Sequence, residues 1–241
     1  MGLLSGEDRD GEAKNRTFIF LMKGRYVCMK TETLLTATFQ ELAVLIRDTV
    51  REKAQEIPKF RDEGNGAIRI LVYPLCKAAD AWMGGMGDFD KEGSPDIPDY
   101  EVTFAITSGG SRVIRGVWDG VEQKCDCYAY SAMKIAHCSR AQDVGAGLLS
   151  GLELNDPDLT DDNGYGAHRG ALCVEVGVRD ICGRLSEFCG IYVCVSGADS
   201  ADDLKCAFTA VPKIEEFFQN KAEETVKFEL RVPSEKEVAD V

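Results

Sequence analysis

Histidine is the side chain that most often acts as a general base near neutral pH or ligates haem iron, and this chain has two, His137 and His168. His137 precedes Cys138 in an expected helix. Because neighbours on a helix point about 100° apart, they do not form a nucleophile-base pair, and we expect His137 to be packed or on the surface. His168 lies in a glycine-rich loop before an expected strand. It is the better candidate for contacting a ligand, with a solvated loop histidine as the alternative.

Acidic side chains recur in the loop 83–99 at a spacing that resembles a calcium-binding loop. Counted from residue 88, acids fall at positions 1, 3, 5, 9 and 12, with glycine at position 6, as in the EF-hand schedule. The candidate ligands are Asp88, Asp90, Glu92, Asp96 and Asp99. Position 12 is Asp rather than the bidentate Glu, and a strand rather than a helix is expected to follow. A solvated acidic insert is therefore the alternative interpretation.

The stretch GIYVCVSGADSADD, residues 190–203, ends a strand in small residues and opens a helix, as many phosphate-binding loops do. Three acids occupy the helix start, where their carboxylates would repel a phosphate, and neither the dinucleotide-binding nor the P-loop pattern is matched. Ser200 followed by Asp203 fits a capping box. We therefore predict a capped helix here rather than a nucleotide site.

The ten cysteines show no Cys-x-x-Cys pair. Cys125 and Cys127 are the closest, but residues two apart on a helix point to opposite sides and cannot share a metal ion. The start of the chain, residues 1–16, is polar and is predicted to be a flexible acidic leader rather than a secretory signal. We therefore expect a cytoplasmic protein whose cysteines are reduced, most of them as small buried side chains.

Charge and hydropathy restrict the partners. With 41 acidic and 28 basic residues the net charge is -13, which disfavours binding to a nucleic acid backbone. No apolar run approaches the roughly 20 residues that cross a membrane. No nucleophile elbow or isolated pair of carboxylates is present, so the sequence assigns no enzymatic reaction.

The elements that must position these residues follow from hydrophobic periodicity. Residues 38–57 carry apolar side chains at helical spacing, and residues 121–141 form a second expected helix whose small residues Cys125, Ala129, Ala132 and Ala136 should lie against a sheet. A third helix begins at residue 201 and is interrupted by Pro212. Strands are expected at 17–22, 25–29, 67–73, 100–106, 171–178, 189–196 and 226–231, and another strand is expected after the turn 108–110, ending near Trp118.

Strands joined mainly by hairpins predict an α+β fold with a mostly antiparallel sheet flanked by helices. We expect residues 17–241 to form a single domain. It would carry an N-terminal hairpin, the inserted acidic loop near 83–99 and a C-terminal edge strand at 226–231.

Two segments resemble the GlcG/HbpS-like family, described as haem-degrading or haem-binding. Residues 102–136, VTFAITSGGSRVIRGVWDGVEQKCDCYAYSAMKIA, resemble its strand, glycine turn, second strand, Asp-Gly and helix with a central lysine. Asp119 and Gly120 take the Asp-Gly place, and Lys134 takes the lysine place. The strand ending in Val-Ser-Gly-Ala resembles the end of the family domain. Departures are Ile135, where a small residue is usual, and residues 169–172, where a Gly-Gly-x-Pro segment is usual.

The resemblance implies a profilin-like layering, a homo-oligomer and a pocket that in some relatives takes a tetrapyrrole such as haem or a corrinoid. By this comparison His168 is the candidate axial ligand, and Lys134, Asp119, Ser196 and Gly197 lie near the pocket. The sequence thus predicts an oligomeric, cytosolic small-molecule binding protein. A ligand-free assembly or adaptor protein that uses the same fold for protein contacts is the alternative.

Overall fold

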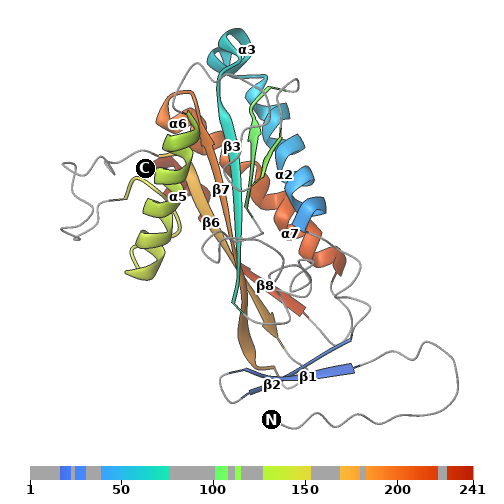
Figure 1. The fold of residues 1–241 in the computed structure, drawn as a ribbon. Helices are drawn as coiled ribbons and strands as arrows, with labels where there is room; N and C mark the ends of the chain where they lie inside the picture. The colour runs from blue at the N-terminus through green and yellow to red at the C-terminus, as the bar shows by residue number, and fades with distance from the viewer. Residues whose placement is uncertain are drawn as a thin grey trace, which may run out of the picture.

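The computed structural model describes residues 17–22, 25–30, 39–75, 101–107, 112–114, 127–152, 169–179, 183–221 and 227–240. These residues form an α+β fold in which a six-stranded sheet is covered by helices on both faces (Figure 1). The predicted fold class is therefore confirmed.

The main sheet has the strand order β5-β4-β3-β7-β6-β8, and every neighbouring pair is antiparallel. The strands are β3 Ala67–Pro74, β4 Glu101–Ala105, β5 Arg112–Ile114, β6 Ala171–Arg179, β7 Leu185–Ser196 and β8 Lys227–Arg231. Strand β7 runs along the centre and is buried from Phe188 onward, as a strand covered on both faces must be. Strands β3 and β7 are far apart in the sequence but pair with each other in the sheet.

The N-terminal hairpin predicted from glycine in its turn is present. Strand β1 Thr17–Met22 pairs with β2 Arg25–Lys30, with Thr17 opposite Lys30 and Met22 opposite Arg25. The two strands make a separate two-stranded sheet.

Helices α2 Phe39–Ala54, α6 Ser200–Phe208 and α7 Ala210–Lys221 cover one face of the sheet (Figure 1). The helical period predicted for α2 is confirmed, because Leu42, Ile46 and Val50 are all fully buried. The break expected near Pro212 falls at Thr209, between α6 and α7. Pro212 then lies in the first turn of α7, where its missing N–H has no intrahelical partner to lose.

Two short helices were not predicted. Helix α3 Pro58–Glu63 follows α2, and Pro58 at the first helical position favours its start because the proline ring already sets a helical φ. Helix α8 Glu235–Asp240 follows β8, and Ser234 with Glu237 forms a capping box at its start: the Glu237 N–H donates to Ser234 Oγ and the Ser234 N–H donates to Glu237 Oε2.

Helix α5 Cys127–Asp143 covers part of the other face and contacts β3, β6 and β7. The predicted small-residue face is wrong: Ala129 and Ala136 are exposed and Ala132 is half-buried. The buried side of α5 carries Cys127, Ser131, Lys134, Ile135, His137, Cys138 and Ala141. Periodicity could not reveal this side, because a lysine at its centre looks like a solvent-facing residue until its partner is known.

Candidate functional site

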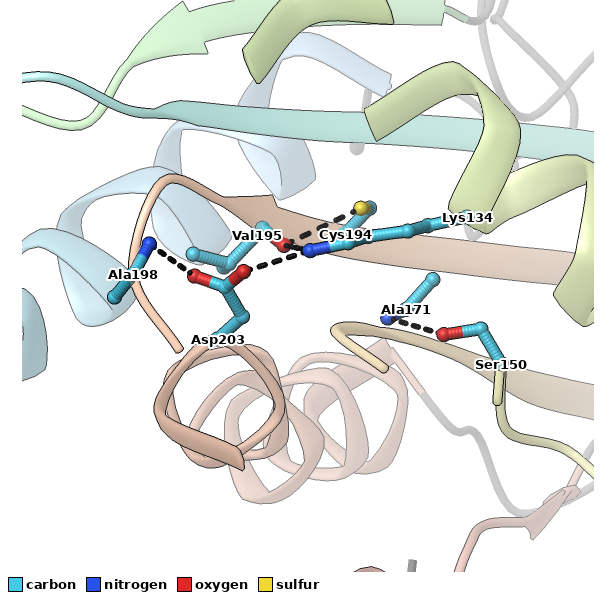
Figure 2. A network of polar contacts seen from close by, with 7 residues as sticks. All are labelled: Lys134, Ser150, Ala171, Cys194, Val195, Ala198 and Asp203. Atoms are coloured by element: carbon cyan, nitrogen blue, oxygen red, sulfur yellow. Dashed lines mark hydrogen bonds and ion pairs between the residues drawn. The ribbon is translucent and has the colours of Figure 1, made fainter. Parts of the chain in front are cut away.

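The only buried ion pair among the described residues joins the two helical layers at one end of the sheet. Lys134 Nζ of α5 lies 2.6 Å from Asp203 Oδ2 of α6, and these side chains are only 5% and 2% exposed. The same Nζ donates to the carbonyl oxygen of Val195 on β7, 3.2 Å away. Figure 2 shows the lysine extended from α5 alongside the last residues of β7 toward Asp203 of α6. The pair therefore ties α5, β7 and α6 together.

Gly170, just before β6, leaves the space through which the lysine passes. A Cβ built on Gly170 would stand 2.6 Å from the Val195 carbonyl oxygen, 2.8 Å from Lys134 Nζ and 2.9 Å from Asp203 Cβ. Its φ of 128° also favours glycine. The Gly170 carbonyl accepts from the Val195 N–H at 2.8 Å, so the same residue stays paired to β7.

Asp203 has a second partner in the turn before α6. Its Oδ1 accepts from the Ala198 N–H at 2.9 Å (Figure 2). Burial raises the pKa of Asp203 above its usual value, and the charge of Lys134 and the hydrogen bonds offset this only in part. The predicted capping box is wrong in detail, because the residue at the N-cap is Asp199 and it makes no side-chain cap hydrogen bond. Asp203 is instead turned inward to Lys134.

The turn at Ser196 and Gly197 is packed rather than open. Ser196 is buried, and a Cβ on Gly197 would stand 2.7 Å from Gly66 Cα and 2.8 Å from the Asn65 carbonyl oxygen. Small residues at this turn suggested a phosphate loop. In the structure, Gly197 instead lets the turn before β3 pack closely against it. Lys134 and this turn lie close together, and both Lys134 Nζ and the space at Gly197 are taken by internal contacts.

His137 faces the loop after α5. Its Nδ1 accepts from the Gly151 N–H at 3.1 Å, and burial lowers the pKa of the imidazole. Next to it, Ser150 Oγ accepts from the Ala171 N–H at 3.0 Å (Figure 2). Of the two placements expected for His137, packed or on the surface, the structure shows the packed one. The imidazole holds the 148–152 loop against α5 and is neutral near pH 7.

The described free cysteines are buried, as predicted: Cys138, Cys173, Cys189, Cys194 and Cys206. Burial raises the pKa of Cys173 and of Cys194 to about 12. Such thiols are not nucleophiles near neutral pH. Cys127 departs from the prediction of reduced cysteines, because it is disulfide-bonded, and its partner is not among the described side chains.

Arg69 on β3 is a residue that sequence reasoning missed. It pairs with Glu101 on β4, and its Cζ lies 4.9 Å from the ring centroid of Tyr128 at the start of α5. Its Nη1 is the one buried side-chain nitrogen or oxygen of the described residues without a hydrogen-bond partner. Glu101 is diagonal to Arg69 across the strand pair, since Arg69 lies opposite Thr103. The sequence gives little sign of such a pair, because the cross-strand register must be known to see it.

The other predicted site residues lie outside the described residues: His168, Asp119 and the acids Asp88, Asp90, Glu92, Asp96 and Asp99. Within the described part of the chain, no group of three or more His, Cys, Asp or Glu side chains could hold a metal ion. In that same part, no helix is both long enough and apolar enough to cross a membrane.

Comparisons with protein-family models, with curated proteins and with solved structures found no match to this chain.

Proposed function

We propose that this protein is an assembly protein that binds other protein chains, including copies of itself, without using a ligand. The observation that carries the proposal is the internal use of the candidate pocket residues. Lys134 is held by Asp203 and Val195, and the turn at Gly197 is filled by its neighbours. These groups stabilise the fold at the place where the resemblance puts a ligand.

Apolar side chains on the sheet beyond the end of α5 support the same function. Tyr73 is 46% exposed and stacks edge-on against Tyr192, which lies under α5, so both rings stand on the α5 side of the sheet. Leu185 is 45% exposed and lies over Gly177 on that side. Apolar groups that stay exposed on a sheet are surface that a protein partner can cover.

Light scattering after size exclusion, together with chemical crosslinking, tests this proposal. Samples from about 1 μM to about 1 mM should show association that increases with concentration. A single-chain mass over the whole range, with no crosslinked species, would overturn the assembly function.

Tetrapyrrole binding is the second candidate, and Arg69 favours it. A buried guanidinium nitrogen without a partner is suited to a carboxylate such as those carried by haem or a corrinoid. Under this hypothesis His168 is the axial ligand, and Lys134, Asp119, Ser196 and Gly197 shape the surroundings.

An absorbance titration of cofactor-free protein with haemin separates the two candidates. A binder gives a Soret shift that saturates near one equivalent per chain, and the His168→Ala variant changes or loses it. A trace identical to that of a non-binding control protein removes the tetrapyrrole candidate and leaves the assembly function to its own test.

A further inference from the structure

Strand β8 is an edge of the main sheet, because among the described residues it pairs only with β6. The free side of an edge strand presents backbone N–H and C=O groups to another strand. The side chains of β8 alternate: Lys227, Glu229 and Arg231 are exposed, whereas Phe228 and Leu230 pack against the core under α2, α6 and α7.

The charged residues of β8 continue a pattern of opposite charges onto β6. Arg231 Nη1 lies 3.0 Å from Glu175 Oε2, and Arg179 Nη2 donates to Glu229 Oε2 at 2.7 Å. Gln142 of α5 donates to Glu175 Oε1 at 2.7 Å, which places these charges on the α5 side of the sheet.

We propose that β8 pairs antiparallel with β8 of a second copy of this chain, so that the two sheets continue across a two-fold axis. The inference rests on the proposed assembly function and identifies its surface. In the register we infer, Leu230 faces Leu230 of the second copy. Glu229 then faces Arg231 of the second copy, and Arg231 faces its Glu229.

Charge favours this register over the one centred on Glu229. If Glu229 faced itself across the axis, Lys227 would face Arg231, and like charges directly opposite each other destabilise a strand pair. Moving the axis from Glu229 to Leu230 removes the contacts of Glu229 with Glu229 and of Lys227 with Arg231. It places Glu229 opposite Arg231 instead. The signs then alternate across four strands, from Arg179 through Glu229 to Arg231 and Glu175 of the second copy. An edge bearing only lysines could not offer such a register.

The opposite face of β8 is compatible with the same pairing. In this register Phe228 faces Val232 of the second copy, and both side chains already pack at the margin of the core. Apolar and β-branched residues opposite each other are favourable cross-strand pairs. The polar and the apolar face of the strand are therefore both compatible with the register centred on Leu230.

The contact is short. A strand of five residues is about 17 Å long, so pairing at this edge buries less than a standard interface of roughly 800 Å² per partner. We expect a weak dimer whose population depends on concentration.

Sedimentation velocity from about 1 μM to about 1 mM measures this dimer. Arg231→Glu places like charges opposite each other twice across the axis, and we expect the dissociation constant to rise at least about tenfold. Glu175→Gln is the matched control: it removes the partner of Arg231 within the chain but leaves the facing charges unchanged. We expect a dissociation constant within about threefold of the wild type.

A fourfold charge reversal gives a sharper test. Glu175→Arg, Arg179→Glu, Glu229→Arg and Arg231→Glu together restore every opposite-charge pair within and between copies. This variant should associate with itself but not with the wild type when differently labelled samples are mixed. If it does not fold by circular dichroism, Arg231→Glu decides alone.

The outcomes distinguish the two proposals. A wild-type protein that stays a single chain overturns the assembly function and this inference together. Association that Arg231→Glu leaves unchanged, or free mixing of wild type with the reversed variant, overturns only the β8 pairing.

Discussion

On one face of the sheet, helices α2, α6 and α7 meet β3, β6 and β7 almost entirely through aliphatic and aromatic side chains. On the other face, α5 places a lysine, a histidine and a serine on its buried side. The first face needs only close packing, which many apolar residues satisfy. The second needs each polar group to meet its partner, because an unpaired buried polar group is costly. The α5 side therefore determines where the helix sits, and the other face provides most of the buried apolar area.

Among the single substitutions that compare the two faces, a substitution of Gly170 should lower the free energy of unfolding most. In Gly170→Ala the new Cβ meets the Val195 backbone and displaces Lys134 Nζ, and its φ is strained for alanine. We expect a loss of about 3 to 5 kcal/mol in the free energy of unfolding, measured by urea titration. Gly183→Ala is the control: its φ is 76° but nothing lies within 4 Å of the new Cβ, so a loss of about 1 kcal/mol is expected. Equal losses would contradict the role of Gly170 as a passage for the lysine.

Substitutions on opposite faces of β7 compare the two regions directly. Ile191 belongs to the apolar face and Cys194 to the α5 face, and both are fully buried. Ile191→Ala should cost about 2 to 5 kcal/mol through the cavity it leaves. Cys194→Ala removes only a sulfur atom and should cost about 1 kcal/mol. Chemical denaturation of both variants checks the order, and a larger cost for Cys194→Ala would reverse the comparison.

How far the sequence predicted these regions depends on the range of the interactions. Helix α2 was predictable because Leu42, Ile46 and Val50 repeat locally at helical spacing. The buried side of α5 was not, because the partner of Lys134 lies 69 residues away in the sequence, and without that partner a buried lysine is not expected. The resemblance brought Lys134 and the turn at Ser196 into one region. The resemblance did not indicate Asp203. The sequence assigned this residue to a capping box, whereas in the structure its side chain points inward to Lys134.

The pH dependence of stability reports on the buried polar groups of the α5 side. Burial lowers the pKa of His137 below its ordinary value of 6.5, so the unfolded chain binds a proton more readily than the folded one. The contribution of the neutral His137 to the free energy of unfolding is therefore complete well above pH 6.5, and it is lost as the pH falls through this value. His137→Gln, whose side-chain oxygen can still accept from Gly151, should flatten this part of the profile. Thermal unfolding of both proteins between about pH 5 and pH 8 measures the difference, and parallel profiles would contradict a buried neutral imidazole.

The exposed face of α5 should give the smallest effect. Ala136→Glu places a charge where the sequence pattern predicted contact with the sheet but where the structure has an exposed residue. We expect the free energy of unfolding to change by less than about 0.5 kcal/mol. A loss of several kcal/mol would show that Ala136 faces the sheet, as the sequence pattern predicted.

Lys134 and Asp203 stabilise the fold by pairing with each other, and a double-mutant cycle measures the energy of this pairing. Lys134→Met and Asp203→Leu should each cost about 3 to 5 kcal/mol in the free energy of unfolding, because each leaves a buried charge without its partner. The double variant removes both charges and should recover at least about 2 kcal/mol relative to the sum of the single losses. Small single losses, or losses that simply add, would contradict the claim and return Lys134 to the candidates for ligand binding.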